Sequence, residues 1–171
     1  MVEEVILVNE ADIPVGKMEK IEAHRKALLH RAFSVFIFDG EGRMLLQRRA
    51  DGKYHSPGLW TNACCSHPRP EEDTEAAALR RLREELGFAT PLTRLFAFTY
   101  RSEYDNGLTE FEFDHVFVGH YDAAIHPDPA EVSDYCYRSV DEIRADLQSY
   151  PARYTTWFHL AFPMVSERYR G

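Results

Sequence analysis

Cysteine is scarce in this sequence of 171 residues: Cys64 and Cys65 are adjacent, and Cys136 stands alone. An odd count of this kind does not make a disulfide framework and is typical of proteins from a reducing compartment. Long apolar runs are missing too, since no run approaches the roughly 18 residues of a membrane span. The first residues, MVEEVILVNE, carry acid where a signal peptide needs positive charge. We therefore expect a cytoplasmic protein with no membrane partner.

Basic residues are fewer than acidic residues in this sequence. The 20 Lys and Arg residues face 28 Asp and Glu residues, for a net charge of −8. A field of that sign disfavours a broad nucleic-acid groove, so an anionic ligand would have to be bound by a local basic cluster. With 44% hydrophobic residues the chain is not disordered. The length, and the lack of any repeat or linker, predict one domain over residues 1–171.

Apolar periodicity and turn residues predict a domain of mixed α and β type. The predicted strands are Val5–Asn9, Ala32–Phe38, Arg43–Arg49, Thr93–Arg101 and Leu108–Gly119, with a hairpin turn at 39–42. The predicted helices are Glu75–Leu86 with Gly87 after it, a helix from the Ser139 capping box to about Gln148, and a segment of about Ala152–Arg170 interrupted near Pro163. The segment Asp51–Pro70 is rich in Pro, Gly, Asn and Ser, so we expect an irregular loop there.

One predicted strand carries three carboxylates on a single face. Alternation places Glu110, Glu112 and Asp114 on one side, and Phe111, Phe113 and Phe117 on the side expected to form core. Two carboxylates about 7 Å apart along a strand repel each other unless a cation joins them. The strand alone leaves two interpretations open: a solvated edge face or a cation site.

The chain contains eight histidines, and each taken singly is more often a surface or core residue than a ligand. His24 and His30 would not align on a continuous helix, so they could meet only across a bend before the following strand. His67 ends the cysteine-containing loop. Three imidazoles with two carboxylates would suit Zn²⁺, Mn²⁺ or Mg²⁺ without deciding among them.

The adjacent cysteines allow three interpretations. A zinc ribbon would need two cysteine pairs, and Cys136 has no second cysteine near it in sequence. A single catalytic thiol requires only one loop cysteine with polar neighbours. A small buried apolar residue is equally compatible with the sequence.

Basic residues gather in and beside the same loop, and bidentate arginines suit phosphoryl oxygens. They are Lys20, Arg48, Arg49 and Lys53. Arg81 could add to this cradle, or it could form an ordinary solvated pair with Glu85 on the predicted helix.

The segment E-x7-RRLREELGF from Glu72 resembles the Nudix box, G-x5-E-x7-REUxEExGU with U apolar. Ser66 stands at the position of the glycine and Arg81 at the first Glu of the RE pair, while Glu84 and Glu85 match the later Glu pair. These departures disfavour a generic Nudix hydrolase. Together with other motifs, this altered box resembles the type 1 isopentenyl-diphosphate isomerase family, a Nudix branch. The resemblance covers nearly the whole chain. Those motifs are Met18-Glu19-Lys20, His24, His30, Arg48-Arg49, the 60–68 run WTNACCSHP, Tyr100-Arg101, Glu110-Phe111-Glu112 and Trp157.

The resemblance implies an α/β fold of the Nudix kind, an α/β/α sandwich with a mixed β-sheet. It also implies the site residues. The metal ligands would be His24, His30, His67, Glu110 and Glu112, and the catalytic pair would be Cys65 and Glu112. Glu85 would hold a second Mg²⁺ with the substrate diphosphate. Substrate contacts would come from Lys20, Arg49, Lys53, Arg81, Tyr100 and Trp157.

The implied activity is isomerisation of isopentenyl diphosphate to dimethylallyl diphosphate in isoprene biosynthesis, with a divalent metal (Mn²⁺, Zn²⁺ or Mg²⁺) at the His/Glu site and Mg²⁺ on the diphosphate. The partner would be a small prenyl diphosphate, and the chain a monomer or weak homodimer. A Nudix pyrophosphohydrolase acting on a nucleoside or prenyl diphosphate is the alternative, and a zinc-dependent binding module without turnover is the third.

Overall fold

The computed structural model describes residues 2–169. Its strands, all in one mixed sheet, are β1 (Glu4–Val8), β2 (Pro14–Glu19), β3 (His30–Phe38), β4 (Met44–Arg49), β5 (Trp60–Thr61), β6 (Cys64–Ser66), β7 (Leu92–Glu103), β8 (Thr109–His120) and β9 (Val132–Arg138). The helices are α1 (Lys20–Arg25), α2 (Thr74–Leu86), α3 (Val140–Ser149) and α4 (Thr156–Arg168), with a 3-10 turn, η1, at Pro151–Arg153. None of the helices within residues 2–169 is both long and apolar enough to cross a bilayer.

Strand β3 is the centre of the sheet. It runs parallel to β8 and antiparallel to β1, β4 and β6, while β7 runs antiparallel to β8. In this register His30 on β3 and Tyr100 on β7 both lie opposite Glu112 on β8. On the other side of β3, Cys65 lies opposite Ser34. Chain segments far apart in sequence therefore meet in two rows across the sheet, one at His30 and one at Ser34, four residues further along β3.

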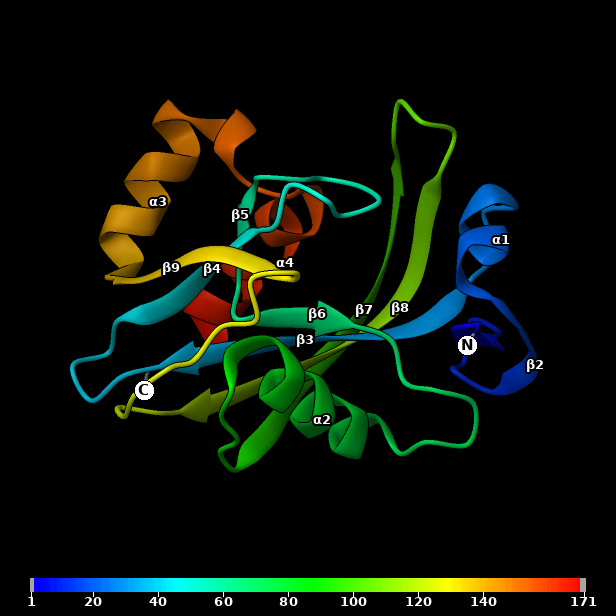
Figure 1. Cartoon of the computed structure of the whole chain (residues 1–171), viewed down its shortest axis with the longest axis horizontal. Helices are drawn as coiled ribbons and strands as arrows, with labels where there is room; N and C mark the ends of the chain where they lie inside the picture. The colour runs from blue at the N-terminus through cyan, green and yellow to red at the C-terminus, as the bar shows by residue number, and fades with distance from the viewer. Residues whose placement is uncertain (1, 170–171) are drawn as a thin grey trace.

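Helices cover both faces of this sheet, with α2 on one side and α3 and α4 on the other (Figure 1). Alternate residues of β3 divide between two cores: Phe33 and Val35 pack toward Leu82 of α2, and Phe36 packs toward Phe158 of α4. The predicted α/β/α sandwich with a mixed sheet is confirmed.

The predicted helix ends are also confirmed. Asp73 caps the first turn of α2 by accepting a hydrogen bond from the backbone N–H of Ala76, and Gly87 ends the helix with φ +75°. Ser139 caps α3 by accepting from the backbone N–H of Glu142. The hairpin between β3 and β4 forms with Phe38 opposite Met44.

Two predictions about regular structure were wrong. The segment Asp51–Pro70 is not wholly irregular, because β5 and β6 lie within it and pair with β4 and β3. Helix α4 is not interrupted at Pro163, because burial of its apolar face against the sheet outweighs one missing backbone hydrogen bond. Arg170, the expected end of that segment, lies outside the described residues. Strands β2 and β9 and helix α1 were not predicted.

The expected burial of β8 was wrong at its amino-terminal half. Phe111 and Phe113 are only half-buried, whereas Glu110 and Glu112 are each 4% exposed and Asp114 is 1% exposed. The strand is interior, between β3 and β7, so its carboxylate face is not a solvated edge.

Candidate active site

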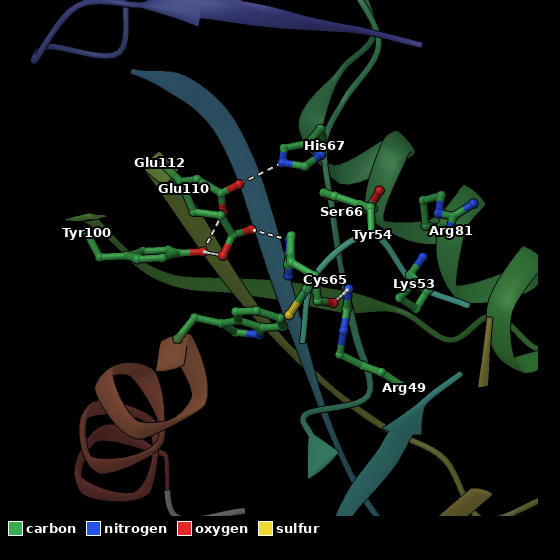
Figure 2. Close-up of a pocket in the computed structure, with 12 residues that line it drawn as sticks. Arg49, Lys53, Tyr54, Cys65, Ser66, His67, Arg81, Tyr100, Glu110 and Glu112 are labelled. Atoms are coloured by element: carbon green, nitrogen blue, oxygen red, sulfur yellow. Dashed lines mark hydrogen bonds and ion pairs between the residues drawn. The ribbon is translucent and has the colours of Figure 1, made fainter. Parts of the chain in front are cut away.

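The carboxylate of Glu112 joins three elements of the sheet. Its Oε1 accepts a hydrogen bond from the hydroxyl of Tyr100 at 2.5 Å. Its Oε2 lies 3.0 Å from Nε2 of His30 and 2.7 Å from Nε2 of His67 (Figure 2 shows the His67 contact). The β3–β8 and β7–β8 registers place His30 and Tyr100 there, and the chain after β6 supplies His67.

Two of the imidazoles have their tautomer set by the backbone. His24 Nδ1 lies 2.6 Å from the carbonyl oxygen of Lys20, and His30 Nδ1 lies 2.8 Å from that of Leu28. A carbonyl only accepts, so each Nδ1 carries a proton, and in the neutral ring Nε2 offers a lone pair. The Nε2 of His24 is buried without a hydrogen-bond partner among the described residues. A lone pair facing carboxylate oxygen needs a proton or a cation between the two, so this donor set fits a metal ion.

The pKa values follow from burial and these contacts. Burial, together with the nearby His67, lowers the pKa of His24 to about 4. Burial acts to lower the pKa of His30, but the hydrogen bond and charge of Glu112 outweigh it and raise that pKa. Burial acts to raise the pKa of Glu112, and His67 and His30 outweigh it and hold that pKa well below its ordinary value.

Four of the five expected metal ligands form one group. The ligand atoms of His24, His30, His67 and Glu112 all lie within 4.8 Å of one another. Glu110 falls in a neighbouring group with His24 and His55. The Nε2 of His55 lies 3.2 Å from Oε2 of Glu110, and this neighbour was not predicted. The sequence feature that could have indicated His55 was its position in the same loop as Lys53.

Hydroxyl groups of two tyrosines fix the other oxygen of Glu110. Tyr104 donates to Oε1 at 2.5 Å and Tyr100 lies 3.2 Å from the same atom. Tyr104 was likewise not predicted. The Tyr100 hydroxyl, which donates its one proton to Glu112, thus lies between the two carboxylates, and Tyr104 is the donor to Glu110.

The alternation of strand β6 separates the two adjacent cysteines. Cys64 is fully buried on the α2 side, where its Sγ lies 3.0 Å from Oε2 of Glu85. Cys65 is on the opposite face and lines the cavity that Glu112 also lines. Burial raises the pKa of both thiols, so both are neutral at neutral pH. All three cysteines are free, as the sequence indicated.

Basic side chains line the opposite wall of the same cavity: Arg49, Lys53 and Arg81 (Figure 2). Lys53 and Arg81 both contact Glu131, at 2.5 and 3.4 Å. Lys20 lies beside them, with Nζ 4.6 Å from the ring centroid of Tyr54. Arg48, from the same basic run, is exposed and donates to the carbonyl of Gly58.

Glu85 lies beneath this wall rather than on a solvated helix face. It is 4% exposed, with Arg81 Nη2 at 3.3 Å and Gln47 Nε2 at 3.1 Å from its carboxylate oxygens. Gln47 was not predicted, and only the tertiary placement of β4 against α2 brings it here.

Aromatic rings complete the cavity. Trp157 in the first turn of α4 and Tyr100 on β7 both line it. The guanidinium of Arg49 lies 5.2 Å from the Trp157 ring centroid. The cavity therefore combines a carboxylate and imidazole cluster, one thiol, a basic wall and an apolar surface. Such a cavity suits proton transfer on a small anionic molecule that has an apolar part.

Comparison with known proteins agrees with this chemistry. Residues 28–158 match the family described as NUDIX domain. The chain is 50% identical over 168 residues to an isopentenyl-diphosphate Delta-isomerase of Pectobacterium atrosepticum, covering 98% of this chain and 94% of that protein. It is 48% identical over 168 residues to the enzyme of the same name from Nocardia farcinica, covering 97% and 96%.

Solved structures share the fold at lower identity. A crystal structure of a Deinococcus radiodurans protein has a TM-score of 0.79 at 23% identity, covering 98% of this chain and all of that one. A MutT NUDIX hydrolase from Burkholderia pseudomallei has a TM-score of 0.64 at 21% identity, covering 80% and 98%. These two similarities bear on the fold alone.

Proposed function

The chain belongs to the NUDIX domain family and, within it, to the isopentenyl-diphosphate Delta-isomerases, and from that membership we propose that it converts isopentenyl diphosphate into dimethylallyl diphosphate. The observation that carries the proposal is that Cys65, Glu112 and the basic residues line one cavity. Two groups able to exchange protons thus adjoin a place for a diphosphate.

The reaction moves a double bond by adding one proton and removing another. The terminal methylene carbon gains a proton, the intermediate has tertiary-carbocation character, and the carbon beside the CH₂–O group loses a proton. The proton count balances. Cys65 and Glu112 are the groups that give and take these protons.

The basic wall supports diphosphate binding in a chain of net charge −8. Arg49, Lys53 and Arg81 would face the phosphoryl oxygens, and Lys20 would approach from the side. Glu131, which now contacts Lys53 and Arg81, would lose part of these contacts to the substrate. Glu85 below Arg81 would hold Mg²⁺ that accompanies the diphosphate.

A divalent metal would neutralise the carboxylates and orient Glu112. Its ligands would be His24, His30, His67 and Glu112, with Glu110 beside them. The hydroxyl of Tyr100 holds the other oxygen of Glu112 and limits its rotation. Trp157 would offer a π face to the developing cation. Trp157 and Tyr100 line the same cavity as the basic wall, so the prenyl group would pack on these rings while the diphosphate meets the cations.

The test is incubation with Mg²⁺ and isopentenyl diphosphate in heavy water. We expect dimethylallyl diphosphate that carries deuterium in its methyl group. A Nudix hydrolase would instead release phosphate or a phosphorylated alcohol without deuterium on carbon, and that outcome would replace the proposal. A protein that binds metal but gives neither product would be a binding module.

A further inference from the structure

The thiol of Cys65 has two oxygen neighbours whose own hydrogen bonds are already committed. Asn62 Oδ1 lies 3.1 Å from Sγ, and Ser34 Oγ lies 3.4 Å from it. Ser34 donates its hydroxyl proton to Asp114 Oδ2 at 2.7 Å. Both oxygens therefore present lone pairs to Sγ, and the closer one belongs to Asn62.

The orientation of the Asn62 amide is determined by the backbone around it. Its Nδ2 donates to the carbonyl oxygens of Val35 at 2.9 Å and Cys64 at 3.0 Å. Carbonyls only accept, so the NH₂ group must face them and Oδ1 must face Cys65. Asn62 is fully buried, and burial makes this arrangement costly to change.

The same Oδ1 is the end of a chain of hydroxyl groups. Thr61 Oγ1 donates to Asn62 Oδ1 at 2.8 Å, and Thr155 Oγ1 donates to Thr61 Oγ1 at 2.9 Å. Thr155 is the N-cap of α4 and accepts from the backbone N–H of Phe158. The backbone N–H of Thr155 also donates to the carbonyl of Trp60 at 3.0 Å. Thr61, Asn62 and Thr155 thus connect Cys65 to the first turn of α4, which carries Trp157.

We propose that Asn62 is a positioning residue for the Cys65 thiol, and that Thr61 and Thr155 fix the distance between this thiol and Trp157. The inference rests on the proposed role of Cys65 in proton transfer. A proton donor or acceptor has to meet one carbon of a substrate whose prenyl group packs on the aromatic wall, so the thiol and the wall need a constant separation. Misplacement by about 1 Å can lower a rate about 100-fold.

The first experiment is steady-state isomerisation by Thr61→Val, which removes the hydroxyl and keeps the side-chain shape. We expect kcat to fall about 10- to 100-fold while KM changes less than about twofold, because the diphosphate contacts are untouched. Thr61→Ser restores the hydroxyl and should recover most of kcat. Thr90→Val is the matched control, since it removes a hydroxyl that donates to the His120 carbonyl away from the cavity, and it should leave both constants unchanged.

The second experiment measures the hydrogen bonding of the Cys65 thiol directly, in the absence of substrate turnover. The infrared S–H stretching band of Cys65 is assigned by difference from Cys65→Ser. Thr61→Val leaves Cys65 as the only hydroxyl or thiol donor to Asn62 Oδ1 within residues 2–169, so the band should move to lower frequency. In Asn62→Ala, which removes the acceptor, the band should move to higher frequency.

An unchanged S–H band in folded Thr61→Val, or a kcat equal to that of the parent, would overturn the inference. A loss of melting temperature with unchanged kcat per folded molecule would also overturn it, because it would show a structural role alone. If the parent protein forms no deuterated dimethylallyl diphosphate, the proposed function fails, while the S–H band still decides whether Asn62 holds the thiol.

Discussion

At the scale of single residues, the adjacent thiols Cys64 and Cys65 show how a strand gives neighbours different chemistry. Side chains along a strand alternate between faces. Cys64 therefore meets Glu85 on the α2 side, and Cys65 meets Asn62 and the cavity on the other side.

We predict that Cys65→Ala loses at least about 100-fold in kcat, the usual contribution of a positioned acid or base. Cys64→Ser retains a donor for Glu85 and should keep most of the activity. Steady-state assays of both variants decide the assignment. Activity surviving in Cys65→Ala but lost in Cys64→Ser would move the chemistry to the α2 side of the sheet.

A second residue prediction concerns acid stability of the metal-free protein. His24 has an ordinary pKa near 6.5 when unfolded and about 4 when folded. As the pH falls below 6.5 the unfolded chain takes up this proton first, so stability present above 6.5 is lost progressively between 6.5 and 4. The loss from this group is of the order of 3 kcal/mol.

Urea unfolding of chelator-treated protein at pH 7 and pH 5 measures this effect. His24→Gln should show a smaller drop between the two pH values than the parent, because it has no imidazole to protonate. His126→Gln, at an exposed position, should match the parent. Equal drops in all three proteins would mean that other groups set the acid sensitivity.

At the scale of elements, helix α2 packs an apolar face against the sheet and places a basic side chain at the cavity. Leu82 and Leu86 pack into the core against the sheet. Arg81 lines the cavity and contacts Glu84 at 2.7 Å and Glu85 at 3.3 Å. Arg81 stands where the Nudix box has an acid. The helix therefore contributes a cation to the cavity at that position.

We predict that Arg81→Glu raises the KM for isopentenyl diphosphate strongly, at least about tenfold, because a charge-assisted phosphate contact becomes a repulsion. The substitution restores the box pattern, yet we expect no pyrophosphohydrolase activity. Product analysis by phosphate release checks this. Hydrolysis by the variant would show that residue 81 alone separates the two activities.

At the scale of the whole molecule, the metal group draws on α1, β3, β8 and the chain after β6. These elements come from separate parts of the sequence, so an ion bound among them links much of the fold. Binding to the folded state but not to the unfolded one stabilises by mass action.

Chelator treatment should therefore lower both the melting temperature and the activity. His67→Ala should mimic it and should lose metal on elemental analysis. His126→Ala is the control and should behave as the parent. Unchanged metal content in His67→Ala would remove His67 from the ligand set.

Local sequence patterns were enough to predict helix α2 with both of its ends and the β3–β4 hairpin, because capping, turn residues and periodicity act over a few residues. The resemblance carried by short motifs predicted the fold. It did not predict that α4 continues through Pro163, since burial against the sheet is a tertiary effect.

What the sequence by itself determined was the set of chemical groups and the local elements that carry them. Only the tertiary structure decided which groups meet. His30 and Glu112 are 82 positions apart, and Thr61 and Thr155 are 94 apart. The parallel register of β3 and β8 makes the first contact, and docking of α4 against the 60–65 segment makes the second. Such contacts depend on how whole elements pack, so no periodicity within one segment could reveal that His55 lies beside Glu110.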